Sequence, residues 1–272
     1  LSLLVAALTL IMTPGRGLGQ TPLNADTQIE ISLENMGISG SFRPGSYVPV
    51  RLNLLSRLEE ATPVQIVFEV PNDDGDIEQY SRAAVLSPGR SSFKWLYPVV
   101  TPNSSAEELV RQAFSVRIYE DDDGDFGAEL ASRMIDAAGA NTLGQVVQMT
   151  EDMLVIVGEG SLGLNAYEGM NNRKSPLPSL NQRTVVINAS PGDLPDDPPG
   201  YIGVDDMVWA GADPAELGLE NARALRTWIK QGGRLVIVLS ENADLWGLGG
   251  QARSALSDLL PKTAPDQLRD VP

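Results

Sequence analysis

Apolar and polar residues alternate through the first half of the chain, over residues 27–120. Alternation with a period of two predicts strands that bury one face, and turn-rich stretches at 42–45, 71–75 and 87–89 separate them. The candidate strands lie at 29–33, 47–54, 64–70, 92–97 and 114–119. We therefore expect an N-terminal antiparallel β-sandwich over residues 27–120, followed by a connector at 121–151, in which 127–134 could be helical.

The pattern changes after Asp152, where the apolar runs become continuous, as in parallel strands that are buried on both faces. Four such runs occupy residues 153–157, 184–189, 205–209 and 234–239. Between the last two, apolar residues recur at helical spacing from Leu219 to Ile229, and a glycine pair follows. Residues 152–272 thus predict a mostly parallel, flavodoxin-like α/β domain, and an incomplete one because it has four clear strands.

Part of this second half resembles a known family. The string Gly203-Val-Asp-Asp-Met-Val-Trp209 and the run at 221–238 resemble the class I glutamine amidotransferase-like domain, closest to its ThuA-like and non-catalytic branches. In catalytic members of that family, the nucleophile follows the strand equivalent to 234–239. Here Ser240-Glu241-Asn242 stand at that turn, so the cysteine needed for glutamine hydrolysis is absent. The resemblance implies a degenerate domain, with Ser240 as the one candidate nucleophile.

Composition removes several chemistries. The 272 residues include no cysteine and no histidine, which excludes disulfides, thiolate zinc sites and a Ser-His-Asp triad assembled from this chain. Twenty basic against 36 acidic residues give a formal charge of −16, which repels phosphate backbones and anionic membranes. We expect no nucleic-acid partner.

The first twenty residues read as an export signal. An apolar run from Leu1 to Met12 precedes Gly17 and Gly19, which supply the small residues that a signal peptidase needs. We expect a signal peptide over 1–20 and a location on the periplasmic or cell-envelope side. An exported sandwich before such a domain also resembles large envelope proteins of planctomycete-type bacteria, which implies a membrane anchor outside the given chain.

Two acidic strings and one glycine-rich string are further candidates. Asp121, Asp123 and Asp125 could supply oxygen ligands to Ca²⁺, and residues 72–76 form a similar string, although both also suit hairpin turns. Residues 158–163 match the dinucleotide pattern G-x-G-x-x-G, which we interpret as a turn without ligand because Glu159 would meet the pyrophosphate. Trp246, in a glycine-rich loop, is a candidate stacking residue for a ligand.

These observations predict a non-enzymatic envelope protein without a cofactor that binds or scaffolds an unidentified protein or envelope component. Two alternatives stay open. One is a serine hydrolase that uses Ser240 with residues beyond the C-terminus, and the other is a calcium-dependent adhesion module.

Overall fold

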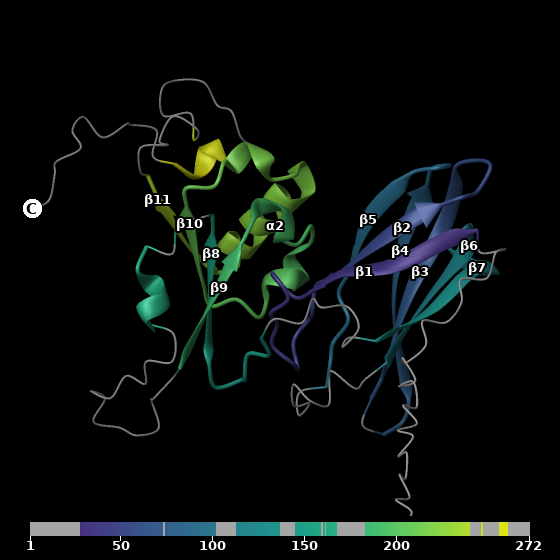
Figure 1. Ribbon diagram of the computed structural model, residues 1–272, viewed down its shortest axis with the longest axis horizontal. Helices are drawn as coiled ribbons and strands as arrows, with labels where there is room; N and C mark the ends of the chain where they lie inside the picture. The colour runs from purple at the N-terminus through teal and green to yellow at the C-terminus, as the bar shows by residue number, and fades with distance from the viewer. Residues whose placement is uncertain are drawn as a thin grey trace, which may run out of the picture.

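The computed structural model describes residues 28–72, 74–101, 113–136, 145–158, 160, 162–167, 183–239, 246 and 256–260. Figure 1 shows two units side by side, one built of antiparallel sheets and the other of a parallel sheet with its helix. Within the described residues, we find no helix with the length and apolar character needed to cross a membrane.

Two antiparallel sheets share one hydrophobic core and form what we call the sandwich unit. The first sheet has the order β1-β2-β5, with strands Ile29–Met36, Val50–Ser56 and Ser91–Leu96. The second has the order β4-β3-β6-β7, with strands Ile77–Leu86, Thr62–Pro71, Ala113–Asp122 and Asp125–Asp136. Alternate residues of β2 are fully buried, because one face of this strand lies against the core.

Arginines close both open sides of the sandwich unit. Arg133 of β7 donates a hydrogen bond to the Ile31 carbonyl of β1. Arg82 of β4 donates from Nη1 to the Trp95 carbonyl of β5 at 2.8 Å. Edge strands carry unpaired backbone groups, so each arginine satisfies a carbonyl at the edge of the opposite sheet.

The stretch 127–134 is strand and not helix. It belongs to β7, which pairs antiparallel with β6 through a tight turn at Asp123 and Gly124. Both turn residues have positive φ, 53° and 98°, as a two-residue hairpin turn requires. The four-stranded sheet therefore extends beyond residue 120.

The second unit, which we call the parallel-sheet unit, has the strand order β11-β10-β8-β9. Its strands are Asp152–Val157 (β8), Thr184–Ala189 (β9), Asp206–Ala210 (β10) and Arg234–Val238 (β11). One α-helix, α2 (Leu219–Lys230), joins β10 to β11 and buries Ala222, Leu225 and Trp228. Gly233 follows this helix because a Cβ there would lie 2.2 Å from the ring of Trp228.

The expectation of a flavodoxin-like α/β domain is wrong. Such a fold covers a parallel sheet with helices, whereas the described residues hold a single α-helix and far more strand than helix. The crossover from β9 to β10 consists instead of two 3₁₀ turns, η3 (Pro191–Asp193) and η4 (Pro198–Tyr201). Prolines at 191, 195, 198 and 199 prevent a helix there, because each lacks a backbone donor and clashes with the preceding turn.

Candidate functional site

A tight turn between β1 and β2 carries a side chain of the sandwich unit into the parallel-sheet unit. Ser39 and Gly40 have φ of 48° and 80°, and Ile38 and Ser41 exchange two backbone hydrogen bonds of 2.9 Å. Gly37 has φ of 91°, and a Cβ on it would lie 2.2 Å from the Ser41 carbonyl oxygen. Ile38, at the tip, is 1% exposed and lies in the core of the parallel-sheet unit. We call residues 37–41 the Ile38 turn.

Arg43 joins the sandwich unit to the first strand of the parallel sheet. Its Nη2 donates to the Glu151 carbonyl oxygen at 2.5 Å and to Asp205 Oδ2 at 2.7 Å. The same carboxylate oxygen accepts the backbone N–H of Met153 at 2.7 Å. Burial, and then the charge of Asp205, raises the pKa of Asp152 beside this group. Arg43 therefore neutralises the carboxylate of Asp205, which lies near the acidic side chains of Asp152 and Asp206.

A second ion pair ties β4 to the crossover of the parallel-sheet unit. Arg82 contacts both carboxylate oxygens of Asp196, with N–O distances of 2.8 and 2.9 Å. The Tyr97 hydroxyl donates to Asp196 Oδ1 at 2.6 Å and accepts the Asp196 backbone N–H at 3.0 Å. Burial, followed by the charge of Asp196, raises the pKa of Tyr97 well above its ordinary value. The hydroxyl therefore stays protonated and serves as a fixed donor.

Two further contacts reach η3. Ser39 Oγ donates to Asp193 Oδ2 at 3.1 Å, and Arg51 Nη1 donates to the Gly192 carbonyl oxygen at 3.0 Å. The Arg51 guanidinium also lies over the ring of Phe93, 4.2 Å from its centroid, where a cation is attracted by the ring face. The junction is thus bonded at several separate points.

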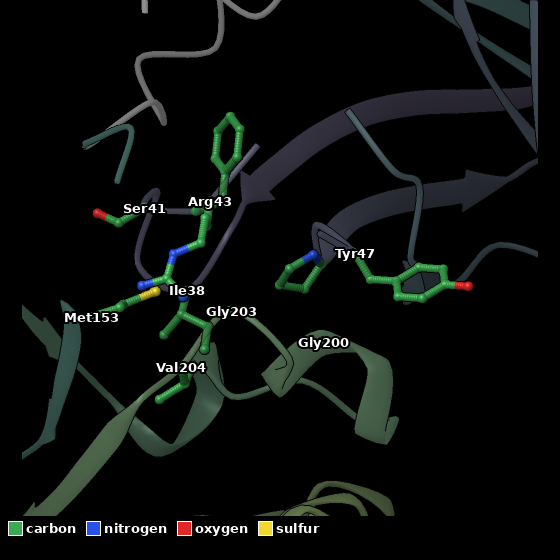
Figure 2. Close-up of a pocket in the computed structure, with 10 residues that line it drawn as sticks. Ile38, Ser41, Arg43, Tyr47, Met153, Gly200, Gly203 and Val204 are labelled. Atoms are coloured by element: carbon green, nitrogen blue, oxygen red, sulfur yellow. The ribbon is translucent and has the colours of Figure 1, made fainter. Parts of the chain in front are cut away.

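A shallow recess, partly open to solvent, lies at the same junction, and its cavity volume of about 10 Å³ is the space of roughly one water molecule. Figure 2 shows Arg43 directed toward Met153, with Ile38, Gly203 and Val204 nearby, while Tyr47 points away from them. Pockets that bind drug-sized ligands usually have volumes of roughly 300–1,000 Å³. The junction therefore has the properties of a packed interface more than those of a substrate cleft.

The Asp-rich strings are turns. Asp121 and Asp125 flank the β6–β7 turn, Asp123 adopts positive φ within it, and Asp121 Oδ1 accepts the Gly124 N–H at 2.8 Å. Asn72 Oδ1 likewise accepts two backbone N–H groups in the turn at 72–76. No group of three acidic side chains suited to a metal ion occurs within the described part of the chain. Turn geometry accounts for the residue types in both strings, and calcium binding at Asp121, Asp123 and Asp125 stays a prediction.

Gly158 has a packing role. It has φ of 127°, and a Cβ on it would lie 2.1 Å from the carbonyl oxygen of Ala210 on the neighbouring strand. The turn after it leads to η1 (Leu164–Tyr167), a 3₁₀ helix of four residues. A dinucleotide fingerprint needs a full helix whose N-terminus meets the pyrophosphate. The glycine at 158 therefore permits close approach of two strand ends.

Ser240 lies outside the described residues, and the last described strand before it, β11, ends at Val238. The expectation for Trp246 is wrong. This side chain is 4% exposed and packs edge to face on Trp209, with 5.5 Å between the ring centroids. It belongs to the core because its indole fills space beside the buried end of β10.

The residues that form the junction escaped the sequence analysis. Arg43, Arg82 and Asp196 lie in no motif. Asp205 lies in the string at 203–209 but was given no role there, and the two partners of each pair are more than one hundred residues apart in sequence. A signal was present in the prolines at 191–199. A crossover that cannot form a helix needs cover from elsewhere in the chain.

No family model and no curated protein sequence matches the chain. Solved structures that match include the Pseudomonas fluorescens alkylpurine DNA glycosylase AlkC (12% identity, 41% of this chain, 31% of that chain, TM-score 0.25). They also include R. palustris CsgH, with 14% identity over 42% of this chain and 97% of that chain and a TM-score of 0.25. An immunoglobulin-like protein from Pseudomonas aeruginosa matches with 14% identity over 42% of this chain and 98% of that chain, and its TM-score is 0.22. The match thus spans about a third of the glycosylase. TM-scores this low support no inference about fold or function.

Proposed function

We propose that the protein is a non-catalytic, exported protein of the cell envelope that acts by binding or scaffolding another envelope component. Its sandwich and parallel-sheet units act as one rigid body and need no cofactor. The Ser240 hydrolase and the calcium-dependent module are the competing functions, and no described residue favours either.

The junction between the units is the observation that supports this proposal. A buried apolar side chain, Ile38, fixes the two units in position. The ion pairs of Arg43 with Asp205 and of Arg82 with Asp196 then fix their orientation, and the second pair is bidentate and therefore directional. An interface of this kind suits a protein that holds partners at a set spacing.

Charge supports the same function. The formal charge of −16 disfavours nucleic acid and anionic lipid and favours solubility or a basic partner. The export that the N-terminal residues predict would bring the protein to such a partner on the periplasmic or cell-envelope side. We propose that this partner is a protein or another envelope component.

Distance measurements between spin labels test the rigid junction. The chain has no cysteine, so Ser132→Cys with Glu216→Cys labels one exposed site on each unit. Ser132→Cys with Glu59→Cys, both exposed sites within the sandwich unit, is the matched control. We expect distance distributions of similar width for the two pairs. A distribution across the junction that is much broader than the control would contradict a fixed scaffold.

Enzyme assays test the absence of catalysis. We expect neither glutamine nor a simple nitrophenyl ester to be hydrolysed above the buffer rate, and we expect Ser240→Ala to be indistinguishable from the wild type. Turnover by the wild type that disappears in Ser240→Ala would replace the scaffold with the serine hydrolase.

A further inference from the structure

Strand β4 is an edge strand that differs from the edge strands β1 and β5 of the other sheet. It stands at the end of the β4-β3-β6-β7 order and pairs on one side with β3. The edges of β1 and β5 receive arginine side chains. One of these, Arg82, comes from the core-facing side of β4, where it also binds Asp196. On β4 the outward-facing residues at both ends are exposed apolar side chains, Ile77 at 62% and Val85 at 57%. A long edge strand without lysine or proline offers its backbone for pairing with another strand.

We propose that two copies of the protein pair through β4, antiparallel, about a two-fold axis at Ser81. The two four-stranded sheets then form one continuous sheet of eight strands. In this register Ile77 of each copy lies opposite Val85 of the other, and Gln79 lies opposite Ala83. Such a contact is isologous, so every favourable pair occurs twice.

Side-chain chemistry on the outward face fits this register. The outward residues of β4 are neutral, namely Ile77, Gln79, Ser81, Ala83 and Val85. Like charges opposite one another would destabilise a pair of strands, and none occurs among them. In a protein with a net charge of −16, a strand whose two charges, Glu78 and Arg82, cancel is a surface on which a second copy meets little repulsion.

Charges beyond the ends of β4 are complementary. The turn before the strand carries exposed Asp74 and Asp76, and the turn after it carries exposed Arg90. Antiparallel pairing about Ser81 brings the acidic turn of one copy beside the Arg90 turn of the other, at both ends of the paired strands. This complementarity favours a second copy over an unrelated extended peptide, which would have to match the same charges independently.

A single cysteine on the axis tests the proposal. Because the chain has no cysteine of its own, Ser81→Cys places one thiol of each copy opposite the other, within the Cα separation that a disulfide needs. Ser132→Cys, exposed on β7 at the other edge of the same sheet, is the matched control. We expect mild oxidation to convert Ser81→Cys to a covalent dimer and to form no covalent link between copies of Ser132→Cys. Equal cross-linking of the two variants, or none in Ser81→Cys, would overturn the proposed register.

Analytical ultracentrifugation of the protein without added cysteines is the second test of the dimer. We expect the wild type to sediment at twice its 29.1 kDa mass, and Val85→Lys to raise the dimer dissociation constant at least about tenfold, because each dimer holds two lysines. Val236→Lys, at a site 55% exposed on β11, is the control and leaves the dimer intact. A wild type that is monomeric at all concentrations, or a dimer that Val85→Lys does not weaken, would overturn the proposal. Thermal unfolding of each variant shows that it is folded.

Discussion

The two units of the molecule fill their cores in different ways. The sandwich core is composed of its own strands, with Phe68 and Phe114 in contact across β3 and β6. The parallel-sheet core contains Ile38, which belongs by sequence to the sandwich unit. A sheet with one buried face can be covered by another sheet of the same unit, whereas a parallel sheet needs cover on both faces. The second unit therefore depends on the first.

The crossover from β9 to β10 explains this dependence. A helix in this position would supply apolar side chains to cover the sheet, and prolines prevent that helix. The 3₁₀ turn η4 contributes the fully buried Tyr201, whose hydroxyl donates to the Pro195 carbonyl oxygen at 3.0 Å. The Ile38 turn supplies a further apolar side chain, Ile38, to the core of the parallel-sheet unit. Replacing a helix by turns makes a neighbouring unit part of the core.

The largest expected effect is confined to the parallel sheet. Gly158→Ala should destabilise the protein by about 3 kcal/mol or more, because the new methyl group meets the Ala210 carbonyl in addition to the strain of positive φ. Gly211→Ala, also at positive φ but with open space around the new Cβ, should cost about 1 kcal/mol. Chemical denaturation of both variants measures the difference. Equal losses would show that close packing does not explain Gly158.

A smaller effect is expected where the two units are joined. Asp196→Asn removes the charge that pairs with Arg82 and should cost about 2 kcal/mol, less than a fully buried pair because the Arg82 side chain is 35% exposed. Asp206→Asn breaks a similar bidentate pair with Arg234, which is 71% exposed, and should cost less than about 1 kcal/mol. The denaturation midpoints of the two variants show which substitution costs more stability. If Asp206→Asn proves the more damaging, the junction is not held by its ion pairs.

The smallest expected effect depends on pH. The pKa of Asp152 is raised, chiefly by burial, so its charged form is disfavoured in the folded protein. Asp152→Asn should therefore stabilise the protein at neutral pH, by less than about 1 kcal/mol because solvent screens the group. The gain should shrink as pH falls through the raised pKa and vanish below the ordinary aspartate value of about 4. Measuring the free energy of unfolding of the wild type and of Asp152→Asn from about pH 7 to about pH 4 tests this pH dependence. A gain that is constant with pH would refute the electrostatic cause.

The sequence predicts the strands that bury a face well and the two mostly exposed strands, β4 and β7, poorly. The runs predicted at 153–157 and 184–189 appear as β8 and β9, and the helical spacing from Leu219 appears as α2. Strands β4 and β7 were not predicted. Most residues of β4 are exposed or half-buried, so its sequence has no apolar alternation to reveal it. Hydrophobic periodicity reflects burial, and these two strands bury few of their residues.

The candidate site was beyond sequence reasoning for a different reason. A motif reports chemistry between residues that are close in the chain, and the junction pairs Arg43 with Asp205 and Arg82 with Asp196. The local strings that could be recognised, at 121–125 and 158–163, serve turns and packing. Contacts between distant segments depend on how the units are placed, which no single segment specifies.

Hydrogen exchange of Ile38→Ala tests the central claim most directly. Removing this side chain should leave a cavity in the parallel-sheet unit and cost about 3 kcal/mol. We expect amide exchange to accelerate in β8, β10 and α2, more than one hundred residues away in sequence, while β3 and β6 of the sandwich unit keep their protection. Faster exchange restricted to β1 and β2, with the parallel-sheet unit unchanged, would show that the units are independent and would contradict the rigid scaffold.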